Sequence, residues 1–208
     1  IIGAGHVGSH CAYAMLMQGV CDKIIFNDII KQKAVSQALD CMDTLPFIPH
    51  RAEITAGELK DIAECDIVII AVGGIQDEDR MAELYSSHNI IKDIVPKIME
   101  YGFNGIFIVI TNPVDIVTYM VQKYSGLPHC RVIGTGTGLD SARLQRILSI
   151  ETGVNPQSIQ AWAVGEHGNS QVPVFSSASI NGKLLTELIK ENPEKFSNIN
   201  FNKIEEKV

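Results

Sequence analysis

One short stretch of the sequence holds a residue suited to moving a proton. His167 lies in GEHG (residues 165–168), directly after an apolar run. A histidine packed in a core needs hydrogen-bond partners, whereas flanking glycines let the chain turn sharply and let another molecule approach. Imidazole is the side chain that most readily exchanges a proton near neutral pH. The pattern therefore predicts that His167 meets a substrate.

A second stretch holds a carboxylate and a guanidinium that could act with this imidazole. Asp140 and Arg143 are three residues apart on a predicted helix and share one of its faces. One interpretation is a surface salt bridge worth about 0–1 kcal/mol. The other gives each residue its own task. Asp140 would accept the Nδ1–H of His167 and favour the protonated ring, and Arg143 would bind a carboxylate with its planar fork.

The third candidate is a glycine-rich turn at the start of the chain. GAGHVG (residues 3–8) follows a strand remnant and opens a predicted helix, and Asp28 ends the next predicted strand 20 residues after Gly8. This is the dinucleotide-binding fingerprint, in which Gly3 makes the turn, Gly5 admits a pyrophosphate and Gly8 packs helix against strand. Asp28 would bind a ribose and repel a 2′-phosphate, which favours NAD over NADP. A glycine-rich turn that binds no nucleotide is the alternative, and His6 would then be an exposed spacer.

Unbroken apolar runs alternate with helical patterns over the first part of the chain. Such runs suit strands that are covered on both faces of a parallel sheet. Alternating strands and helices predict a doubly wound α/β domain of the Rossmann type. The expected strands are residues 24–26, 67–72, 106–110 and 132–133, and the expected helices are residues 9–18, 31–43, 81–101 and 114–124.

The pattern changes after Ile133. A predicted helix over residues 139–151 precedes apolar segments at 160–164 and 172–180, and the latter ends in Asn181-Gly182, a strong hairpin-turn dipeptide. We predict a dinucleotide-binding domain over residues 1–133 and the first part of a mixed α+β substrate domain over residues 134–208. Residues 187–208 carry few apolar anchors and are expected to lean on sequence beyond this chain.

Composition narrows the classes of partner. The 208 residues are 46% hydrophobic and 20% charged, with a formal net charge of −7. An acidic chain without basic clusters disfavours nucleic acid, and no apolar run is long enough to cross a membrane. The five cysteines lack disulfide or metal-ligand spacing, which predicts reduced thiols in the cytoplasm and no metal site.

Four motifs in order resemble the L-lactate dehydrogenase family. They are GAGHVG (3–8), TNPVD (111–115), GTGTGLDSAR (134–143) and GEHG (165–168), and they span nearly the whole chain. GNSQ after the histidine is closer to the L-2-hydroxyisocaproate dehydrogenases of this family. Family chains are longer, which predicts that this sequence is cut at both ends.

The resemblance implies a role for each matching residue. His167 would be the general acid/base, Asp140 would orient it, and Arg143 would bind the substrate carboxylate. Asn112 would reach the nicotinamide and the substrate oxygen, with a cis Asn112–Pro113 peptide. Arg80 lies where the family has a mobile-loop arginine that polarises the substrate carbonyl, although a surface arginine beside Asp79 is the alternative.

The resemblance also implies the cofactor, the substrate class and the assembly. NAD would be held by the glycines and Asp28 already described, and by His6, Val7, Val72, Gly73 and Asn112. The substrate would be a small 2-oxo or 2-hydroxy acid, and the enzyme would be a homotetramer.

The loop GGIQDEDR (residues 73–80) bears on the substrate. Malate dehydrogenases need a second cation there, because an unpaired buried carboxylate is costly; this loop offers acidic residues instead. We therefore expect a monocarboxylic acid, either lactate or a bulkier one. The alternatives are a malate dehydrogenase, an NAD-dependent glycosidase, which GEHGNS does not fit, and a non-catalytic NAD-binding descendant of a dehydrogenase.

A last departure concerns regulation. Family members activated by fructose 1,6-bisphosphate carry a basic pair where this chain has Gln145 and Gln160. Neutral amides bind a bisphosphate weakly, so no such activation is expected.

Overall fold

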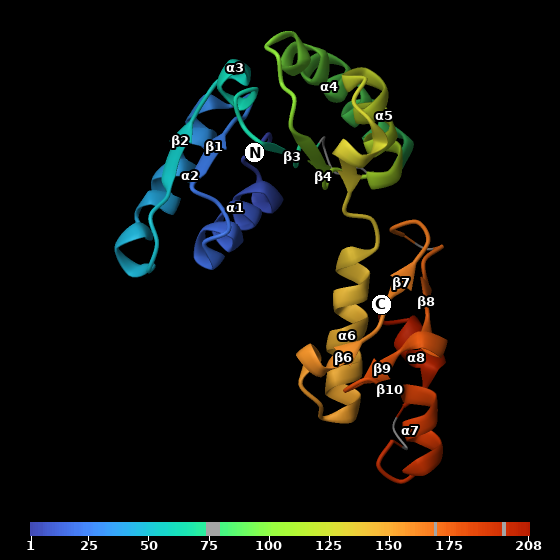
Figure 1. Cartoon of the computed structure of the whole chain (residues 1–208). Helices are drawn as coiled ribbons and strands as arrows, with labels where there is room; N and C mark the ends of the chain where they lie inside the picture. The colour runs from blue at the N-terminus through green and yellow to red at the C-terminus, as the bar shows by residue number, and fades with distance from the viewer. Residues whose placement is uncertain (74–79, 169, 197–198) are drawn as a thin grey trace. The chain divides into compact units, whose positions relative to one another are not determined.

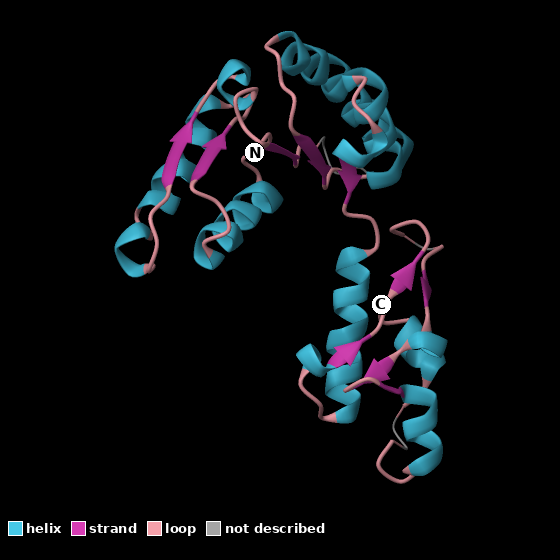
Figure 2. Cartoon of the chain, in the orientation of Figure 1, coloured by secondary structure: helices cyan, strands magenta, loops and turns pink. Residues whose placement is uncertain are grey.

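The chain divides into two units, Ile1–Gly134 and Thr135–Val208, here called the first and second units. The computed structural model describes residues 1–73, 80–168, 170–196 and 199–208, except for the side chains of residues 80–83. Figure 1 labels the helices and strands, and Figure 2 colours them by type. Each unit is described by itself.

A parallel sheet forms the centre of the first unit. Strands β1 and β2 pair with each other, and β4 pairs with both β3 and β5. Ile2 bridges Asn27 after β1 and Ile70 in β3, and so joins the two groups. The resulting order is β2-β1-Ile2-β3-β4-β5. From Ile2 the chain first adds strands on one side and then adds strands on the other side, as in doubly wound dinucleotide-binding folds. The strands are β1 (Lys23–Phe26), β2 (Glu53–Ala56), β3 (Ile67–Ile70), β4 (Ile106–Val109) and β5 (Val132–Gly134).

Helices cover both faces of this sheet. Ile24 and Phe26 are buried in one cluster with side chains of α1 and α2, whereas Ile25 is buried in another with side chains of α4 and α5. Because alternate residues of a strand point to opposite faces, the two clusters lie on the two sides of the sheet. The helices are α1 (His6–Gln18), α2 (Lys31–Met42), α3 (Leu59–Ile62), α4 (Arg80–Glu100) and α5 (Val114–Ser125).

The second unit packs short antiparallel strands against one long helix. Strands β6, β9 and β10 form one sheet, and β7 and β8 form a hairpin. Leu144 and Leu148 of the long helix α6 are buried in a cluster with Ile180 and Leu185. The elements are α6 (Gly138–Thr152), β6 (Ile159–Gln160), β7 (Ala163–Val164), β8 (Val172–Pro173), β9 (Ser179–Ile180), β10 (Lys183–Leu184), α7 (Leu185–Glu191) and α8 (Phe201–Glu205).

The second unit differs from the sequence prediction in three places. The predicted segment 160–164 is divided between β6 and β7, which belong to different sheets. The predicted segment 172–180 is interrupted by a 3-10 turn, Phe175–Ser177, between β8 and β9. Residues 187–208 were expected to have few apolar anchors, but Phe196 and Ile204 are buried in the same cluster as Leu144. These two apolar residues are widely spaced along a polar segment, so no periodic apolar pattern predicts that they are buried.

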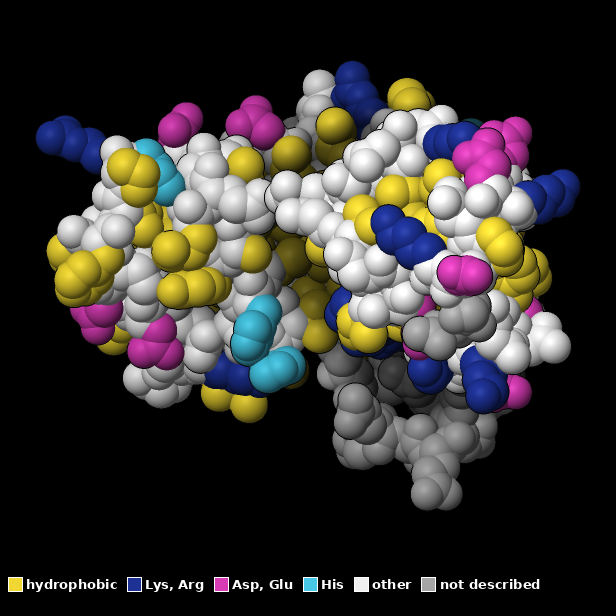
Figure 3. Space-filling view, turned by 90° about the horizontal axis from the view of Figure 1, so that it is seen from below, with side chains coloured by type: hydrophobic (Ala, Val, Ile, Leu, Met, Phe, Trp, Pro, Cys, Tyr) yellow, Lys and Arg dark blue, Asp and Glu magenta, His cyan; other side chains and the backbone are white. Residues whose placement is uncertain are grey.

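The surface mixes side chains of every kind. On the face drawn in Figure 3, dark blue basic side chains are interspersed with acidic and apolar ones. Exposed apolar side chains include Tyr13 and Met17 of α1, Leu39 of α2, and Phe47. Among the helices described, none combines the length and the apolar character that a membrane crossing requires.

Candidate functional site

The second unit brings His167 and Asp140 into contact, although they lie 27 residues apart in the chain. The Nδ1 atom of His167 is 2.5 Å from Oδ2 of Asp140, and the side chain of Asp140 is completely buried. An acidic side chain facing Nδ1 makes that nitrogen the protonated one, which leaves Nε2 as the reactive position of the neutral ring. The side chain of His167 is 25% exposed, so the ring is also accessible.

The loop that carries His167 connects β7 to β8. Gly165 begins the loop with φ +101°, a conformation that favours glycine, and a Cβ there would lie 3.3 Å from the carbonyl oxygen of Ser170. The two ends of the loop are therefore close together, consistent with the pairing of Val164 with Val172. This turn presents the imidazole at the end of the hairpin.

Hydroxyl groups fix α6 to the strand that leads into this loop. Ser141 Oγ accepts the backbone N–H of Ala163 at 3.0 Å, and Thr137 Oγ1 donates to the carbonyl oxygen of Ala163 at 2.8 Å. Asp140 lies between these two residues on α6, so its position relative to the hairpin is set by both bonds. Neither Ser141 nor Thr137 was among the predicted site residues.

Arg143 is paired with Asp140 on the same helix. Its Nη1 donates to Oδ1 of Asp140 at 3.0 Å, and its side chain is 43% exposed. Since Asp140 is buried, this is not a surface salt bridge. A guanidinium has further N–H groups, so one bond to Asp140 leaves donors free for a carboxylate ligand.

The glycine-rich turn of the first unit has the geometry that the fingerprint requires. Gly3 has φ +96°, and a Cβ at Gly8 would lie 2.0 Å from the carbonyl oxygen of Gly3. A Cβ at Gly5 would instead meet only the Nζ of Lys33, at 3.7 Å. The turn is thus closed at Gly3 and Gly8 and open at Gly5, where a phosphate would approach.

Helix α1 begins directly after this opening. Its first N–H groups, those of His6 and Val7, have no acceptor within the helix, and its N-cap Gly5 supplies no side-chain bond. Free N–H groups and the positive end of the helix dipole suit an anion. The side chains of His6 and Val7 are exposed, and the His6 ring lies 4.1 Å from that of His10.

Asp28 lies at the carboxyl end of β1, beside the turn. Its Oδ2 accepts the N–H of Ala4 at 2.8 Å, and its Oδ1 accepts the N–H of Ile30 at 2.9 Å. Each oxygen keeps a second lone pair, so ribose hydroxyls could still donate to it. The carboxylate therefore holds the loop in place and remains able to bind a ligand.

The neighbouring strands end at the same edge of the sheet. Val72 and Gly73 follow β3, and the carbonyl oxygen of Val72 accepts a 2.7 Å bond from Thr111 Oγ1. Asn112 follows Thr111, is exposed, and joins Pro113 through a cis peptide bond, as the resemblance implied. Ser87 Oγ of α4 donates to the carbonyl oxygen of Asn112 at 3.1 Å.

Part of the predicted site falls outside what the structure describes. Arg80 is the first residue of α4, and its side chain is not among those described. Residues 74–79 of the acidic loop are likewise outside the described residues. Within the described ranges, no group of three potential metal ligands occurs.

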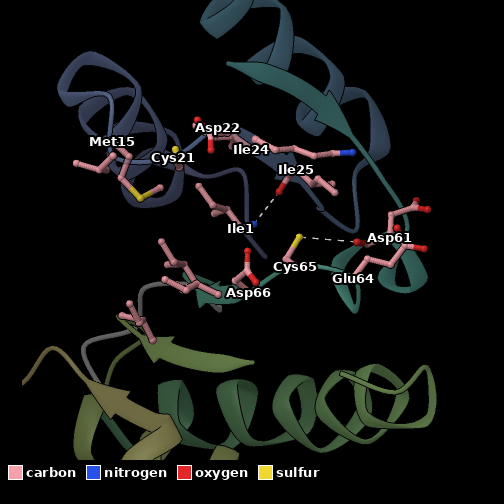
Figure 4. A pocket seen from close by; sticks show the side chains of 15 residues that line it. Ile1, Met15, Cys21, Asp22, Ile24, Ile25, Asp61, Glu64, Cys65 and Asp66 are labelled. Atoms are coloured by element: carbon pink, nitrogen blue, oxygen red, sulfur yellow. Dashed lines mark hydrogen bonds between the residues drawn. The ribbon is translucent and has the colours of Figure 1, made fainter. Parts of the chain in front are cut away.

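A pocket of about 610 Å³ lies at the opposite edge of the first unit's sheet. Figure 4 shows Asp22 and Asp66 among its lining residues, and these precede β1 and β3, respectively. Dinucleotides bind outside the carboxyl ends of parallel strands, whereas this pocket lies at their amino ends. It is therefore distinct from the candidate cofactor site.

Both units match models of one family. Residues 1–134 match the lactate/malate dehydrogenase NAD binding domain, and residues 137–208 match the lactate/malate dehydrogenase alpha/beta C-terminal domain. The L-lactate dehydrogenase of Fusobacterium nucleatum is 52% identical over 209 residues, which cover 100% of this chain and 66% of that protein. L-lactate dehydrogenase 3 of Bacillus anthracis is 43% identical over the same shares. The chain thus spans about two thirds of the length of these relatives.

Solved structures show the same likeness. A lactate dehydrogenase from a Medee basin deep-sea metagenome library has a TM-score of 0.90 and 38% identity, and covers 99% of this chain and 65% of its own. The malate dehydrogenase of Cryptosporidium parvum also has a TM-score of 0.90, with 32% identity, over 99% of this chain and 66% of its own. Backbone geometry is therefore shared by relatives named for different substrates.

Proposed function

Because the chain belongs to the lactate/malate dehydrogenase family, we propose that the whole protein interconverts a 2-oxo acid and the corresponding L-2-hydroxy acid, with NAD as coenzyme. The observation that carries this proposal is the 2.5 Å contact between Nδ1 of His167 and the buried carboxylate of Asp140. This pair can hold a proton on the ring and release it to a substrate oxygen.

The residues of the second unit supply the proton and the substrate anchor. Bound NADH supplies the hydride for reduction of the 2-oxo group. His167 donates its Nε2 proton to the carbonyl oxygen, and Asp140 stabilises the imidazolium before that transfer. Arg143 binds the substrate carboxylate with the N–H groups that do not face Asp140. In the reverse reaction His167 accepts the hydroxyl proton.

The first unit holds the coenzyme in this proposal. The open turn at Gly5 and the N–H groups of His6 and Val7 receive the pyrophosphate, and Asp28 receives the adenosine ribose. Val72, Gly73 and Asn112 contribute the remaining contacts at the carboxyl ends of the strands. Asn112 and Arg80 are assigned to the substrate carbonyl on the basis of the family resemblance.

We assign a monocarboxylic substrate. The residues from Asp77 to Asp79 put negative charge on the loop where a dicarboxylate would need a cation. The curated relatives named above are L-lactate dehydrogenases, which agrees with this assignment. Malate dehydrogenase is the second candidate, supported by the 0.90 TM-score with the enzyme of that name. A higher kcat/KM for oxaloacetate than for pyruvate and 2-oxoisocaproate would select it.

The test of the proposed roles is NADH oxidation by the whole protein with a panel of 2-oxo acids, repeated for His167→Asn. Loss of the acid/base group should lower kcat/KM by about 10²–10⁴-fold, while the Kd for NADH, measured by fluorescence, should be unchanged. His129→Asn is the matched control, because His129 is exposed on a 3-10 turn of the first unit. Full activity of His167→Asn would refute the assignment.

The resemblance also supports a homotetramer. Sedimentation velocity of the whole protein, compared with the mass of one chain, tests this assembly directly. A monomer at micromolar concentration would contradict it.

A further inference from the structure

Among the described residues, Asp140 is the one whose charged side chain is buried. Its side chain is completely buried, and a buried carboxylate is stable only when donors satisfy its oxygens. Among the described residues, three side chains reach it: Arg143 at Oδ1, His167 at Oδ2, and the amide of Gln171. The first two carry or can carry positive charge, whereas the third is neutral.

The surroundings of Gln171 determine how its amide is oriented. With the nitrogen toward Asp140, the amide donates to Oδ2 at 2.8 Å and approaches Oδ1 at 3.3 Å. The opposite orientation would place the amide oxygen against a carboxylate with no proton between them. The donor orientation is therefore the one that satisfies both groups.

Gln171 also lies where it can hold the loop that carries His167. It is the last residue before β8, and its backbone N–H donates to the carbonyl oxygen of Gly168 at 3.3 Å. Asp140 thus receives bonds from both ends of one loop: His167 near its start and Gln171 at its end. The remaining charged group of the loop, Glu166, is exposed and accepts a bond from Ser170 Oγ at 3.1 Å.

We propose that Gln171 is a positioning residue, which keeps the Asp140 carboxylate aimed at His167 without neutralising it. This inference rests on the proposed function. When Arg143 turns its donors to a substrate carboxylate, a neutral amide still holds Asp140 and leaves its negative charge to stabilise the imidazolium. A lysine in this place would hold the carboxylate but cancel that charge.

The first test is Gln171→Leu in the whole protein, with Gln145→Leu as the matched control. Gln145 lies on α6 and donates to the carbonyl oxygen of Ala161 at 3.2 Å, outside the dyad formed by His167 and Asp140. Loss of a hydrogen bond to a charged group should lower kcat/KM for the best 2-oxo acid by about tenfold or more. The Kd for NADH and the thermal midpoint of unfolding are measured for both variants. The values for Gln145→Leu show what the loss of a half-buried glutamine amide does through packing alone.

A second readout needs no substrate. The Nδ1–H proton of His167, observed by NMR in ¹⁵N-histidine-labelled protein, should change its chemical shift or broaden in Gln171→Leu and stay unchanged in Gln145→Leu. An unchanged signal together with wild-type kcat/KM would overturn the proposal. If the wild type turns over no 2-oxo acid, the proposed function fails, but the NMR comparison still decides whether Gln171 positions the dyad.

Gln171→Glu keeps the test decisive if the leucine variant does not fold. An ionised glutamate repels Asp140, whereas a protonated one donates as glutamine does. The activity of Gln171→Glu relative to wild type should therefore rise as the pH is lowered. A ratio that is constant with pH would contradict a role for the donor.

Discussion

At the scale of single residues, Asp140 meets two requirements that oppose each other. It must be shielded from water, so that its charge acts strongly on the imidazole, and its oxygens must still find hydrogen-bond donors, because a buried carboxylate without partners is costly. The side chains around it supply those donors. The chemistry proposed for His167 therefore depends on a network, in which Arg143 and Gln171 matter as much as the dyad distance.

Asp28 is the residue that should set the choice of coenzyme. Asp28→Asn removes the charge and weakens the acceptors, so the Kd for NADH should rise about tenfold, while binding of NADPH should not weaken because the repulsion of its 2′-phosphate is gone. Fluorescence titration with both coenzymes measures the ratio of the Kd for NADH to the Kd for NADPH. Asp22→Asn, at the opposite end of β1, serves as the control. An Asp28→Asn variant with an unchanged NADH-to-NADPH ratio would contradict the assignment.

At the scale of elements, the contact between α6 and β7 positions Asp140 relative to the loop that holds His167. Ser141 is buried, and Ser141→Ala would leave the N–H of Ala163 without its acceptor. We expect a loss of about 1–3 kcal/mol in the free energy of unfolding. Urea unfolding followed by the fluorescence of Trp162, the only tryptophan in the sequence, reports on this unit.

Ser177→Ala is the matched control for that measurement, because Ser177 lies in the same unit as Trp162. Ser177 is exposed, and its Oγ donates to the carbonyl oxygen of Val174, three residues earlier, at 3.2 Å. Its substitution should change the unfolding free energy by less than about 0.5 kcal/mol. Equal effects of the two substitutions would show that the bond to Ala163 contributes nothing special.

The elements also show how far the sequence alone could lead. Strands β1, β3 and β4 were predicted because their apolar runs are buried on both faces, whereas β2 was missed. In β2 only Ile54 is buried, because β2 pairs with β1 alone among the described strands; Thr55 is half-buried, and the two end residues are exposed. The short helix α3 was missed too, although Glu58 and Asp61 form a capping box, a pattern that predicts the start of a helix.

The site divides in the same way. His167, Asp140 and the glycines stand in local motifs that a reader of the sequence can find. Ser141 and Gln171 also stand in motifs of the sequence, but their roles could not be predicted there, because their partners lie 22 and 31 residues away and serine and glutamine are common surface residues. Only folding shows that their polar atoms face the backbone of β7 and the carboxylate of Asp140.

At the scale of the whole molecule, burial should divide the five cysteines into two classes. Burial raises the pKa of the thiols of Cys11, Cys21, Cys41 and Cys65, whereas the side chain of Cys130 is exposed. A raised pKa lowers the thiolate fraction at pH 8, so four thiols should react with an aromatic disulfide reagent at least about tenfold more slowly than Cys130. The difference in reaction rate between Cys130 and the other four thiols should narrow as the pH rises toward the raised pKa values of those four. More than one fast thiol per native chain would contradict this.

The sequence argues against regulation of the whole protein by a sugar bisphosphate. Gln145 and Gln160 occupy the positions of the family's basic pair, and both amides have partners within the second unit. Gln145 donates to the carbonyl oxygen of Ala161, and Gln160 accepts a 3.2 Å bond from Ser179 Oγ. Neutral amides offer a bisphosphate no positive charge, so neither side chain can form the charge-assisted bonds of a basic pair. The pyruvate saturation curve of the whole protein should therefore be the same with and without millimolar fructose 1,6-bisphosphate. A marked shift of the curve to lower pyruvate concentration would show that other cations form the binding site.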